Sequence, residues 1–551
     1  MQGRENSSMP AFADGSNAWD RAVWYYGVLM RRFHPFWQMI LVGALICVPA
    51  GMMLLQRMSS PSGTALDEKT VRYPVTGLVT DGEFPVPDAR MRFKGRSDLV
   101  FTDREGRFRL VAPDAECTRI TAGKEGYLIA GQSVSDDSLK LLLRRLPSED
   151  YQDYQWVDPG PNESRAGNCG NCHASIYDEW QSSGHARSVT GKRFRNLYEG
   201  TDWNGKRGIG WNLQVENPLG AGVCASCHAP TMAVGPEHGL GDLREARGVA
   251  AEGVHCDYCH KVSGLGNGTI GQTHGSFNLD LLRPREGQLF FGPLDDVDRG
   301  EDAFSLLYKD SRYCASCHEG VIFGVHVYST FSEWQASPAK REGKQCQTCH
   351  MKPTGAMTNI APGKGGIERD PQTLANHSFF AGSQKEMLKQ CLHVSSTLRQ
   401  VGADIRTEVE VRADEVGHYV PTGFVDRHLV LVAEGIDKDG KPVSAISGPV
   451  LPLAAGRALV GHSGRLYAKL LKDFDGNSPV PFWRADPEAL DSRLKPGDRD
   501  IVRITFPQAV RKVHVRLIYR RFWQDQAEIK KWPDNEVIVF DQLVEAPAKG
   551  R

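Results

Sequence analysis

The sequence predicts a multidomain protein with one N-terminal transmembrane helix, a small β-sandwich, a mostly α-helical and irregular middle domain, and a C-terminal β-sandwich. Three observations lead to this prediction. Residues 33–56 form an uncharged apolar run, and short alternating apolar runs occur before residue 145 and again after residue 400. Between them the pattern CxxCH occurs five times. The 551 residues, 40% hydrophobic and 24% charged, suit a globular protein of several domains.

Residues 33–57 are predicted to be a transmembrane signal anchor, with residues 1–32 in the cytoplasm. The core of the run, Phe36–Leu55, has the length needed to cross a bilayer, and two arginines precede it. A cleaved signal peptide is the alternative. The long apolar run and the absence of a small-x-small site directly after it favour the anchor.

Residues 70–145 are predicted to form a small antiparallel β-sandwich, because short alternating runs are separated by turn residues. Four segments resemble the carboxypeptidase regulatory-like domain: VTGLV at Val75–Val79, VPDA at Val86–Ala89, TDREGRF at Thr102–Phe108 and GY at Gly126–Tyr127. The resemblance implies this fold and a role as a spacer or binding module. It implies no activity.

The five CxxCH motifs, numbered here in chain order, begin at residues 169, 224, 256, 314 and 346. In each motif two thiols one helical turn apart can bond the two vinyl groups of one porphyrin, and the next residue brings an imidazole to the iron. We therefore expect five covalently bound haem c groups. A zinc ribbon or a redox CxxC is the alternative, but neither requires a histidine after every second cysteine. The predicted haem-binding cysteines are Cys169, Cys172, Cys224, Cys227, Cys256, Cys259, Cys314, Cys317, Cys346 and Cys349, and the proximal iron ligands are His173, His228, His260, His318 and His350.

Residues 165–395 are predicted to be a pentahaem domain with an internal repeat. The second and third motifs begin 32 residues apart, as do the fourth and fifth, and the two pairs are displaced by 90 residues. EWQSSGHAR at Glu179–Arg187 is echoed by EWQASPAKR at Glu333–Arg341. We expect a duplicated two-haem unit in which the second and third motifs have the same geometry as the fourth and fifth.

Each iron needs a second axial ligand or an open face, and this choice separates an electron carrier from an enzyme. Nine histidines outside the motifs lie in or beside this region: His185, His238, His255, His274, His326, His377, His393, His418 and His428. This excess favours two histidines per iron, with ligation by Met232 or Met351 as the alternative. His255, directly before Cys256, and His326, between the fourth motif and EWQ, are selected by position.

The first motif with its following helix, CGNCHASIYDEW, and the segment WQSSGHARS resemble the cytochrome c-554 family of multihaem electron carriers. The resemblance implies that His185 is a distal ligand. It implies the same for His377 in LANHSFF, after the last motif, and for His418 in GHYVPTG, a segment found in related multihaem proteins. The best-known carrier of that family has four haems and lacks both sandwiches, so its partner is not implied here.

Residues 400–548 are predicted to form the second β-sandwich, because TEVEVRA, HLVLVAEGID, DIVRITF and VHVRLIYRRF are rich in β-branched residues. Within it, residues 461–497 are expected to be a loop with a short helix.

Together these patterns predict a membrane-anchored pentahaem cytochrome that relays electrons to other redox proteins or a membrane electron-transfer complex. Because bacteria attach c-type haem outside the cytoplasm, the chain after Arg57 is expected in the periplasm, with a single span in the inner (cytoplasmic) membrane. The net charge of −1 gives no case for nucleic acid as a partner.

Two alternatives remain, and no catalytic residue is assigned. An oxidoreductase acting on a small nitrogen or sulfur compound needs an open iron, and the CxxCK haem of the pentahaem nitrite reductases is missing. A quinol dehydrogenase needs haems at the membrane surface, but residues 70–145 separate the anchor from the first motif. An electron-transfer protein is therefore favoured over a catalyst.

Overall fold

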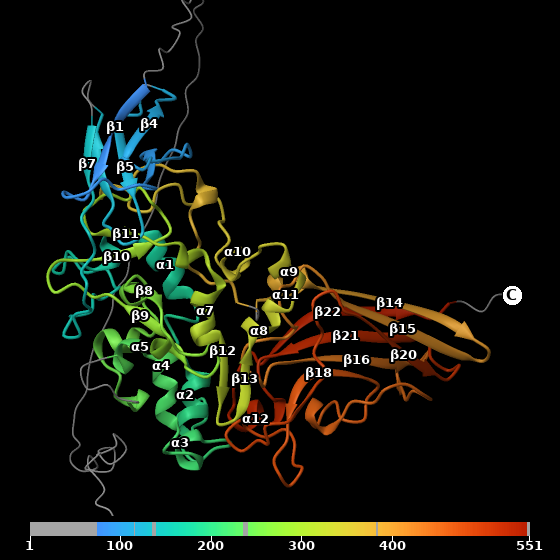
Figure 1. Ribbon diagram of the computed structural model, residues 1–551. Coiled ribbons are helices and arrows are strands. Elements are labelled where there is room, and N and C mark those ends of the chain that lie inside the picture. Colours follow the sequence, from blue (N-terminus) through green and yellow to red (C-terminus); the bar gives the residue numbers. More distant parts are fainter. Residues whose placement is uncertain (1–73, 115, 135–138, 235–240, 382–383, 548–551) are drawn as a thin grey trace, which may run out of the picture. The chain divides into compact units, whose positions relative to one another are not determined.

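The computed structural model describes residues 74–547, apart from gaps at 115, 135–138, 235–240 and 382–383 (Figure 1). The predicted anchor at 33–57 and the segment 1–32 lie outside the described residues. Within the described residues, no helix is both long and apolar enough to cross a membrane. The transmembrane helix therefore has no support from the structure and remains a sequence prediction.

Two sheets at the start of the described chain enclose a common core. Their strand orders are β4-β1-β7 and β3-β2-β5-β6. Val79, Met91, Ile120 and Leu141 fill the space between them, since alternate residues of a strand point to the same face. The strands are β1 (Pro74–Thr80), β2 (Arg90–Phe93), β3 (Val100–Phe101), β4 (Arg107–Val111), β5 (Arg119–Gly123), β6 (Ala130–Ser133) and β7 (Leu139–Leu142). The expectation of a wholly antiparallel sandwich was wrong, because β1 and β7 pair in parallel and the strands of the other sheet provide the crossover.

An acidic loop of the middle region, residues 295–298, contacts the sandwich formed by β1 to β7. Two of its three aspartates, Asp295 and Asp298, have nearly buried side chains, 6% and 2% exposed, so solvent screens their charges little. Four ion pairs result: Arg90–Asp295, Arg92–Asp295, Lys94–Asp298 and Arg119–Asp298. The sandwich is thus held to the middle region by charged contacts as well as by the chain.

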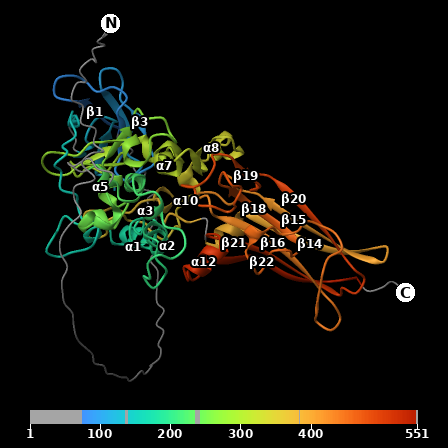
Figure 2. The same ribbon diagram turned by 90° about the horizontal axis from the view of Figure 1, so that it is seen from below.

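The middle region consists of short helices and two-stranded ladders, as Figures 1 and 2 show. The α-helices are α1 (Ala174–Ser182), α2 (Lys192–Glu199), α3 (Leu213–Glu216), α4 (Ala225–His228), α5 (Pro230–Ala233), α6 (Cys256–Cys259), α7 (Ser311–His318), α8 (Thr330–Gln335), α9 (Pro338–Arg341), α10 (Cys346–His350) and α11 (Lys385–Cys391). The 3-10 turns are η1 (Cys169–Asn171), η2 (Ala221–Cys224), η3 (Leu243–Glu245), η4 (Gly248–Glu252), η5 (Gly275–Asn278), η6 (Leu306–Lys309) and η7 (Pro371–Thr373). The paired strands are β8 (Val262–Leu265) with β9 (Leu279–Leu281), β10 (Phe290–Gly292) with β11 (Asp302–Phe304), and β12 (Glu319–Ile322) with β13 (Val325–Ser329).

The C-terminal region has a three-stranded sheet, β14-β15-β20, and a second sheet, β19-β18-β16-β21-β22, with β17 paired to β16 (Figure 2). Val409 and Ile504 of one sheet share a core with Leu431 and Val515 of the other. The elements are β14 (Leu392–Val401), β15 (Asp404–Ala413), β16 (His428–Ile436), β17 (Pro442–Val443), η8 (Leu453–Ala455), β18 (Gly464–Leu471), β19 (Ala489–Asp491), β20 (Arg499–Phe506), β21 (Lys512–Arg520), α12 (Gln524–Ile529) and β22 (Glu536–Glu545).

The expectation of a loop with a short helix at 461–497 was wrong, because two strands of the larger sheet lie there. Strand β18 has the sequence GRLYAKLL, whose leucine, alanine and lysine favour a helix locally. Pairing with β16 on one side and β19 on the other overrides this local preference.

Lys530, just after α12, joins the C-terminal region to the middle region. Its buried ammonium group donates to the carbonyls of Asn196, Thr201 and Ile209, at 2.9, 3.3 and 2.7 Å. The indole of Trp532 donates to the Asn196 side chain at 2.9 Å. The two regions therefore share a built polar interface.

Candidate haem-binding site

Each of the five motifs lies on or beside a helical turn. The third motif begins α6 at Cys256, the fifth begins α10 at Cys346, and the first begins η1 at Cys169. The second spans η2 and α4, and the fourth ends α7. Because residues three apart share a face of a helix, the two thiols of a motif point in one direction. This arrangement suits attachment to one edge of a porphyrin.

Four of the motif histidines have the same hydrogen bond on Nδ1. A carbonyl oxygen can only accept, so Nδ1 carries the proton and Nε2 keeps its lone pair for a metal ion. The contacts are His173 to Ile360 O at 2.8 Å, and His228 to Ser188 O, His260 to Phe291 O and His350 to Phe380 O, each at 2.6 Å. These residues thus fit the proximal ligand of a haem iron.

Two of the predicted distal ligands lie opposite a motif histidine. The ring centres of His185 and His318 are 6.1 Å apart, and those of His418 and His350 are also 6.1 Å apart. Two imidazoles on opposite faces of one metal ion hold their ring centres roughly 6 Å apart, because each metal–nitrogen bond is roughly 2 Å. The structure thus places His185 at the fourth motif and His418 at the fifth.

His377 lies near two other motif histidines. Burial lowers the pKa of His377 to about 4, and the neighbouring rings of His260 and His173 contribute to this shift. Its Nδ1 lies 3.1 Å from the carbonyl of Ala375, which leaves Nε2 available as in the proximal set. His377 is therefore placed between the first and third motifs.

His255 is fully buried beside the third motif. Its Nδ1 accepts from the Tyr258 amide at 3.4 Å, and its Nε2 has no hydrogen-bond partner among the described atoms. Burial lowers the pKa of His255 to about 4, so the ring is neutral at pH 7. Because the neutral ring accepts at Nδ1, its proton is on Nε2, which is therefore a buried donor without a partner and not a free lone pair like that of the proximal histidines. These contacts therefore give His255 no support as an iron ligand.

His326 has a different contact from the other predicted ligands. Its side chain is 38% exposed, and its Nε2 lies 2.6 Å from a carboxylate oxygen of Glu319. The structure therefore gives it a role in the β12-β13 ladder, and its selection from position alone gains no support. His274 is likewise engaged, because its Nε2 lies 3.0 Å from the carbonyl of Gly271.

The contacts correct the expected internal repeat. The side chains of Cys169 and Cys256 are neighbours, as are those of Cys314 and Cys346, so the third motif adjoins the first as the fifth adjoins the fourth. The EWQ tryptophans support this: Trp180 Nε1 donates to Val254 O at 2.9 Å and Trp334 Nε1 to Lys344 O at 2.8 Å. Each carbonyl lies two residues before the third or fifth motif. Equal spacing along the chain had suggested the second motif instead of the first.

The five motifs form one connected cluster with the fourth at its centre. The thiol of Cys317 lies beside that of Cys227 in the second motif and near Cys259 of the third motif. Tyr313, just before the fourth motif, donates to the carbonyl of Cys259 at 3.0 Å. With the pairs above, the fourth motif neighbours the second, third and fifth, and the first joins through the third.

Some residues of this site carry no signal in the sequence. The carbonyls of Ile360, Ser188, Phe291 and Phe380 orient the proximal histidines, but every residue has a carbonyl. Gly275 could have been found from the sequence, because this glycine directly follows the candidate ligand His274. Its φ is +57°, and a Cβ there would lie 2.2 Å from the carbonyl oxygen of Ser226, inside the second motif.

We expect Gly275→Ala to prevent haem attachment at the second motif. The left-handed backbone alone costs a residue with Cβ about 1–2 kcal/mol, and the contact with rigid motif backbone adds to it. The matched control is Gly126→Ala, where φ is +87° but nothing lies within 4 Å of the added Cβ. The haem-to-protein ratio should fall by one haem in the first variant and not in the second; equal ratios would contradict the prediction.

Comparisons with known proteins agree with the geometry of the motifs. The family model for cytochrome c554 and c-prime matches residues 168–261, which include the first three motifs. Among solved structures, a penta-heme cytochrome c552 from Thermochromatium tepidum matches with a TM-score of 0.50 and 22% identity, over 68% of this chain and 97% of that chain. The Fcho1 Mu homology domain of Danio rerio with bound Eps15 peptide matches with a TM-score of 0.12 and 13% identity, over 29% of this chain and 44% of that one, which is too weak for argument. The curated proteins include no match to this chain.

Proposed function

We propose that this multihaem c-type cytochrome carries five haem c groups and relays electrons between redox partners. The observation that supports the relay is the connected cluster of motifs, in which the thiol pairs Cys169–Cys256, Cys227–Cys317 and Cys314–Cys346 join neighbouring sites. Each bound haem supplies a one-electron carrier. Neighbouring carriers without intervening protein layers are the arrangement that electron transfer requires.

The chain's own residues hold and insulate these carriers. Backbone carbonyls orient four of the proximal imidazoles. The ring of His185 lies opposite that of His318 in the fourth motif, and the ring of His418 lies opposite that of His350 in the fifth. If haem is bound at these motifs, an imidazole on each side of its iron would leave a substrate no site there, and the group would supply one-electron transfer. This favours relay over catalysis at these two motifs.

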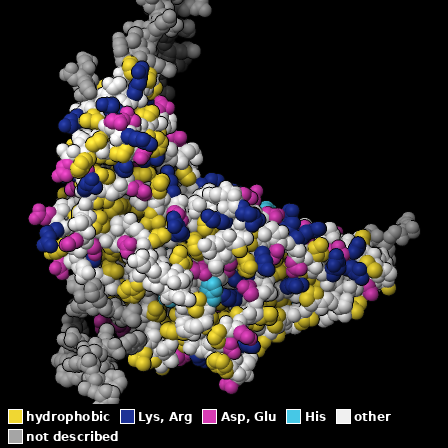
Figure 3. Space-filling view, in the orientation of Figure 1, with side chains coloured by type: hydrophobic (Ala, Val, Ile, Leu, Met, Phe, Trp, Pro, Cys, Tyr) yellow, Lys and Arg dark blue, Asp and Glu magenta, His cyan; other side chains and the backbone are white. Residues whose placement is uncertain are grey.

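The proposed setting is the periplasmic face of the inner membrane, with residues 33–57 as the anchor and other redox proteins or a membrane electron-transfer complex as partners. The uncharged run and the place of haem attachment in bacteria support this. Lys and Arg side chains are interspersed with Asp and Glu over the described part of the face in Figure 3. Such a face suits brief, salt-sensitive encounters with protein partners.

The second motif favours an alternative function, an oxidoreductase of a small nitrogen or sulfur compound. None of the distal candidates whose contacts are given above lies opposite His228, whose ring stacks on Phe194 with centres 4.0 Å apart. An iron with one open face at this motif could bind substrate while the others deliver electrons.

The spectrum of the full-length, haem-loaded protein tests the relay. We expect five haems per chain, only low-spin signals in electron paramagnetic resonance, and an absorption spectrum unchanged by nitrite or hydroxylamine. The physical reason is that two imidazoles per iron give a strong ligand field and no exchangeable position. A high-spin iron that binds nitrite or hydroxylamine and turns it over would replace the relay by the enzyme.

A further inference from the structure

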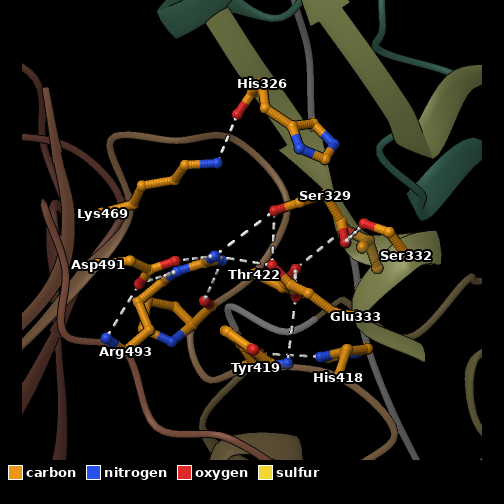
Figure 4. Close-up of polar contacts among 12 residues, drawn as sticks. His326, Ser329, Ser332, Glu333, His418, Tyr419, Thr422, Lys469, Asp491 and Arg493 are labelled. Carbon is orange, nitrogen blue, oxygen red and sulfur yellow. Dashed lines mark hydrogen bonds and ion pairs between the residues drawn. The ribbon is translucent and has the colours of Figure 1, made fainter. Parts of the chain in front are cut away.

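Glu333, in the EWQ segment of α8, accepts three hydrogen bonds and forms one ion pair in a nearly closed site (Figure 4). Its side chain is 5% exposed. One oxygen accepts from Ser329 Oγ at 2.6 Å and pairs with the Arg493 guanidinium at 2.8 Å. The other accepts from the Tyr419 amide at 3.1 Å and from Thr422 Oγ1 at 2.7 Å. A carboxylate bound by so many donors is held in a single orientation.

Arg493, in the C-terminal region, contacts the loop that carries Tyr419 and Thr422. Its side chain is 6% exposed, and its second carboxylate partner is Asp491 at 2.6 Å. The guanidinium donates to Pro421 O at 3.2 Å and lies 5.1 Å from the centre of the Tyr419 ring. Figure 4 shows Arg493 and Glu333 meeting beside Tyr419 and Thr422. The ion pair therefore contacts the loop at Tyr419, Pro421 and Thr422.

His418 belongs to this loop. Its Nδ1 lies 3.0 Å from the carbonyl of Tyr419, and its ring is nearly parallel to that of His350, at 18°. The preceding residue, Gly417, packs so closely on α8 and α9 that a Cβ there would lie 3.3 Å from Ala339 Cβ and 3.5 Å from Trp334 Cδ1. The imidazole opposite the fifth motif is thus supplied by the C-terminal region and positioned through Glu333 of the middle region.

We propose that Glu333 and Arg493 form a latch that holds His418 as the second axial ligand at the fifth motif. Both are positioning residues, since they act through Tyr419, Thr422 and Pro421. The latch makes coordination at the fifth motif depend on docking of the C-terminal sandwich, which gives that sandwich a part in the electron path. This inference rests on the proposed haem at the fifth motif.

Glu333→Gln in the full-length, haem-loaded protein tests the latch. Glutamine has nearly the volume of glutamate, but its NH₂ group donates a hydrogen bond where the carboxylate oxygen accepted one. The contacts of residue 333 with Tyr419 and Thr422 should therefore weaken. Loss of such a supporting contact typically weakens a metal–histidine bond by about 10–100-fold. We expect one haem equivalent per chain to become high-spin and to bind carbon monoxide after reduction. Added imidazole should return that haem to the low-spin form.

Two further variants make the result specific. His418→Gly should give the same high-spin signal, and the double variant should add nothing to it, because both changes act on one bond. Asp150→Asn is the matched control: it removes the carboxylate 2.5 Å from the nearly buried Arg283, away from this loop, and should leave every haem low-spin. Should Glu333→Gln fail to fold, Thr422→Val removes a single bond of the latch and should give a smaller fraction of the same signal.

The outcomes separate the latch from the relay. A high-spin signal from His418→Gly with none from Glu333→Gln or Thr422→Val would overturn the latch and leave the relay intact. A wild-type protein that already shows a high-spin, substrate-reducing iron would overturn the relay, while the change between wild type and Glu333→Gln would still report on the latch. Equal high-spin signals from Asp150→Asn and Glu333→Gln would show that Glu333 contributes to the stability of the protein in general and does not position His418.

Discussion

His185→Ala is expected to convert one low-spin iron of the protein into a high-spin iron that binds external ligands. The ring of His185 lies 6.1 Å from that of His318 and contacts Phe379, with ring centres 4.2 Å apart. Burial lowers the pKa of His185 to about 4, so the imidazole is neutral at pH 7 and its lone pair is available. Alanine removes the imidazole and leaves the apolar Phe379 ring beside the vacated position.

Spin quantification by electron paramagnetic resonance should show one high-spin equivalent per chain. Carbon monoxide should then bind the same fraction of reduced haem, and imidazole should reverse the change. His326→Ala is the matched control, because that ring contacts the Glu319 carboxylate and should leave every iron low-spin. A new high-spin signal from the control, or none from His185→Ala, would contradict the assignment of the fourth motif.

The motifs were readable from the sequence because their chemistry is local. Two cysteines and a histidine within five residues sit on one helical turn wherever that turn lies in the fold, so the proximal side needs no tertiary information. The strands of the C-terminal region were also readable, since long β-branched runs such as DIVRITF have few other stable conformations.

The distal side was not readable in the same way, because its ligands come from distant parts of the chain. His418, which lies beside His350 of the fifth motif, comes from the C-terminal region, where Arg493 pairs with Glu333 of the middle region. Position along the chain favoured His326, but an adjacent strand supplies Glu319 as its partner. Resemblance to known cytochromes selected His185 and His418, whose rings lie 6.1 Å from those of His318 and His350, and their role as distal ligands stays a prediction.

The buried ion pair of the third motif is another feature that sequence reasoning misses. Asp257 and Lys261 are four residues apart, a spacing that usually marks an exposed pair on a helix surface. Here both side chains are 0% exposed. The Lys261 ammonium lies over the Phe290 ring at 4.1 Å, and the Asp257 carboxylate accepts from the Val157 amide at 2.8 Å and the Tyr154 hydroxyl at 3.1 Å.

Lys261→Met is therefore expected to destabilise the protein strongly, because it leaves the Asp257 carboxylate buried without its counter-charge. Breaking such a pair from one side typically costs about 3–5 kcal/mol. The double variant Asp257→Asn, Lys261→Met should recover much of the loss, since a neutral amide can still accept from Val157 and Tyr154. Thermal unfolding of the haem-loaded full chain, at one scan rate, compares the midpoints.

Lys438→Met is the control for the loss of a lysine, because Lys438 and Asp439 form an exposed pair, with side chains 75% and 55% accessible. Solvent and salt already screen such a pair, so its midpoint should stay near that of the wild type. The expected order of midpoints is wild type and Lys438→Met highest, the double variant next, and Lys261→Met lowest. A double variant no more stable than Lys261→Met would show that lysine packing on Phe290, and not its charge, stabilises the third motif.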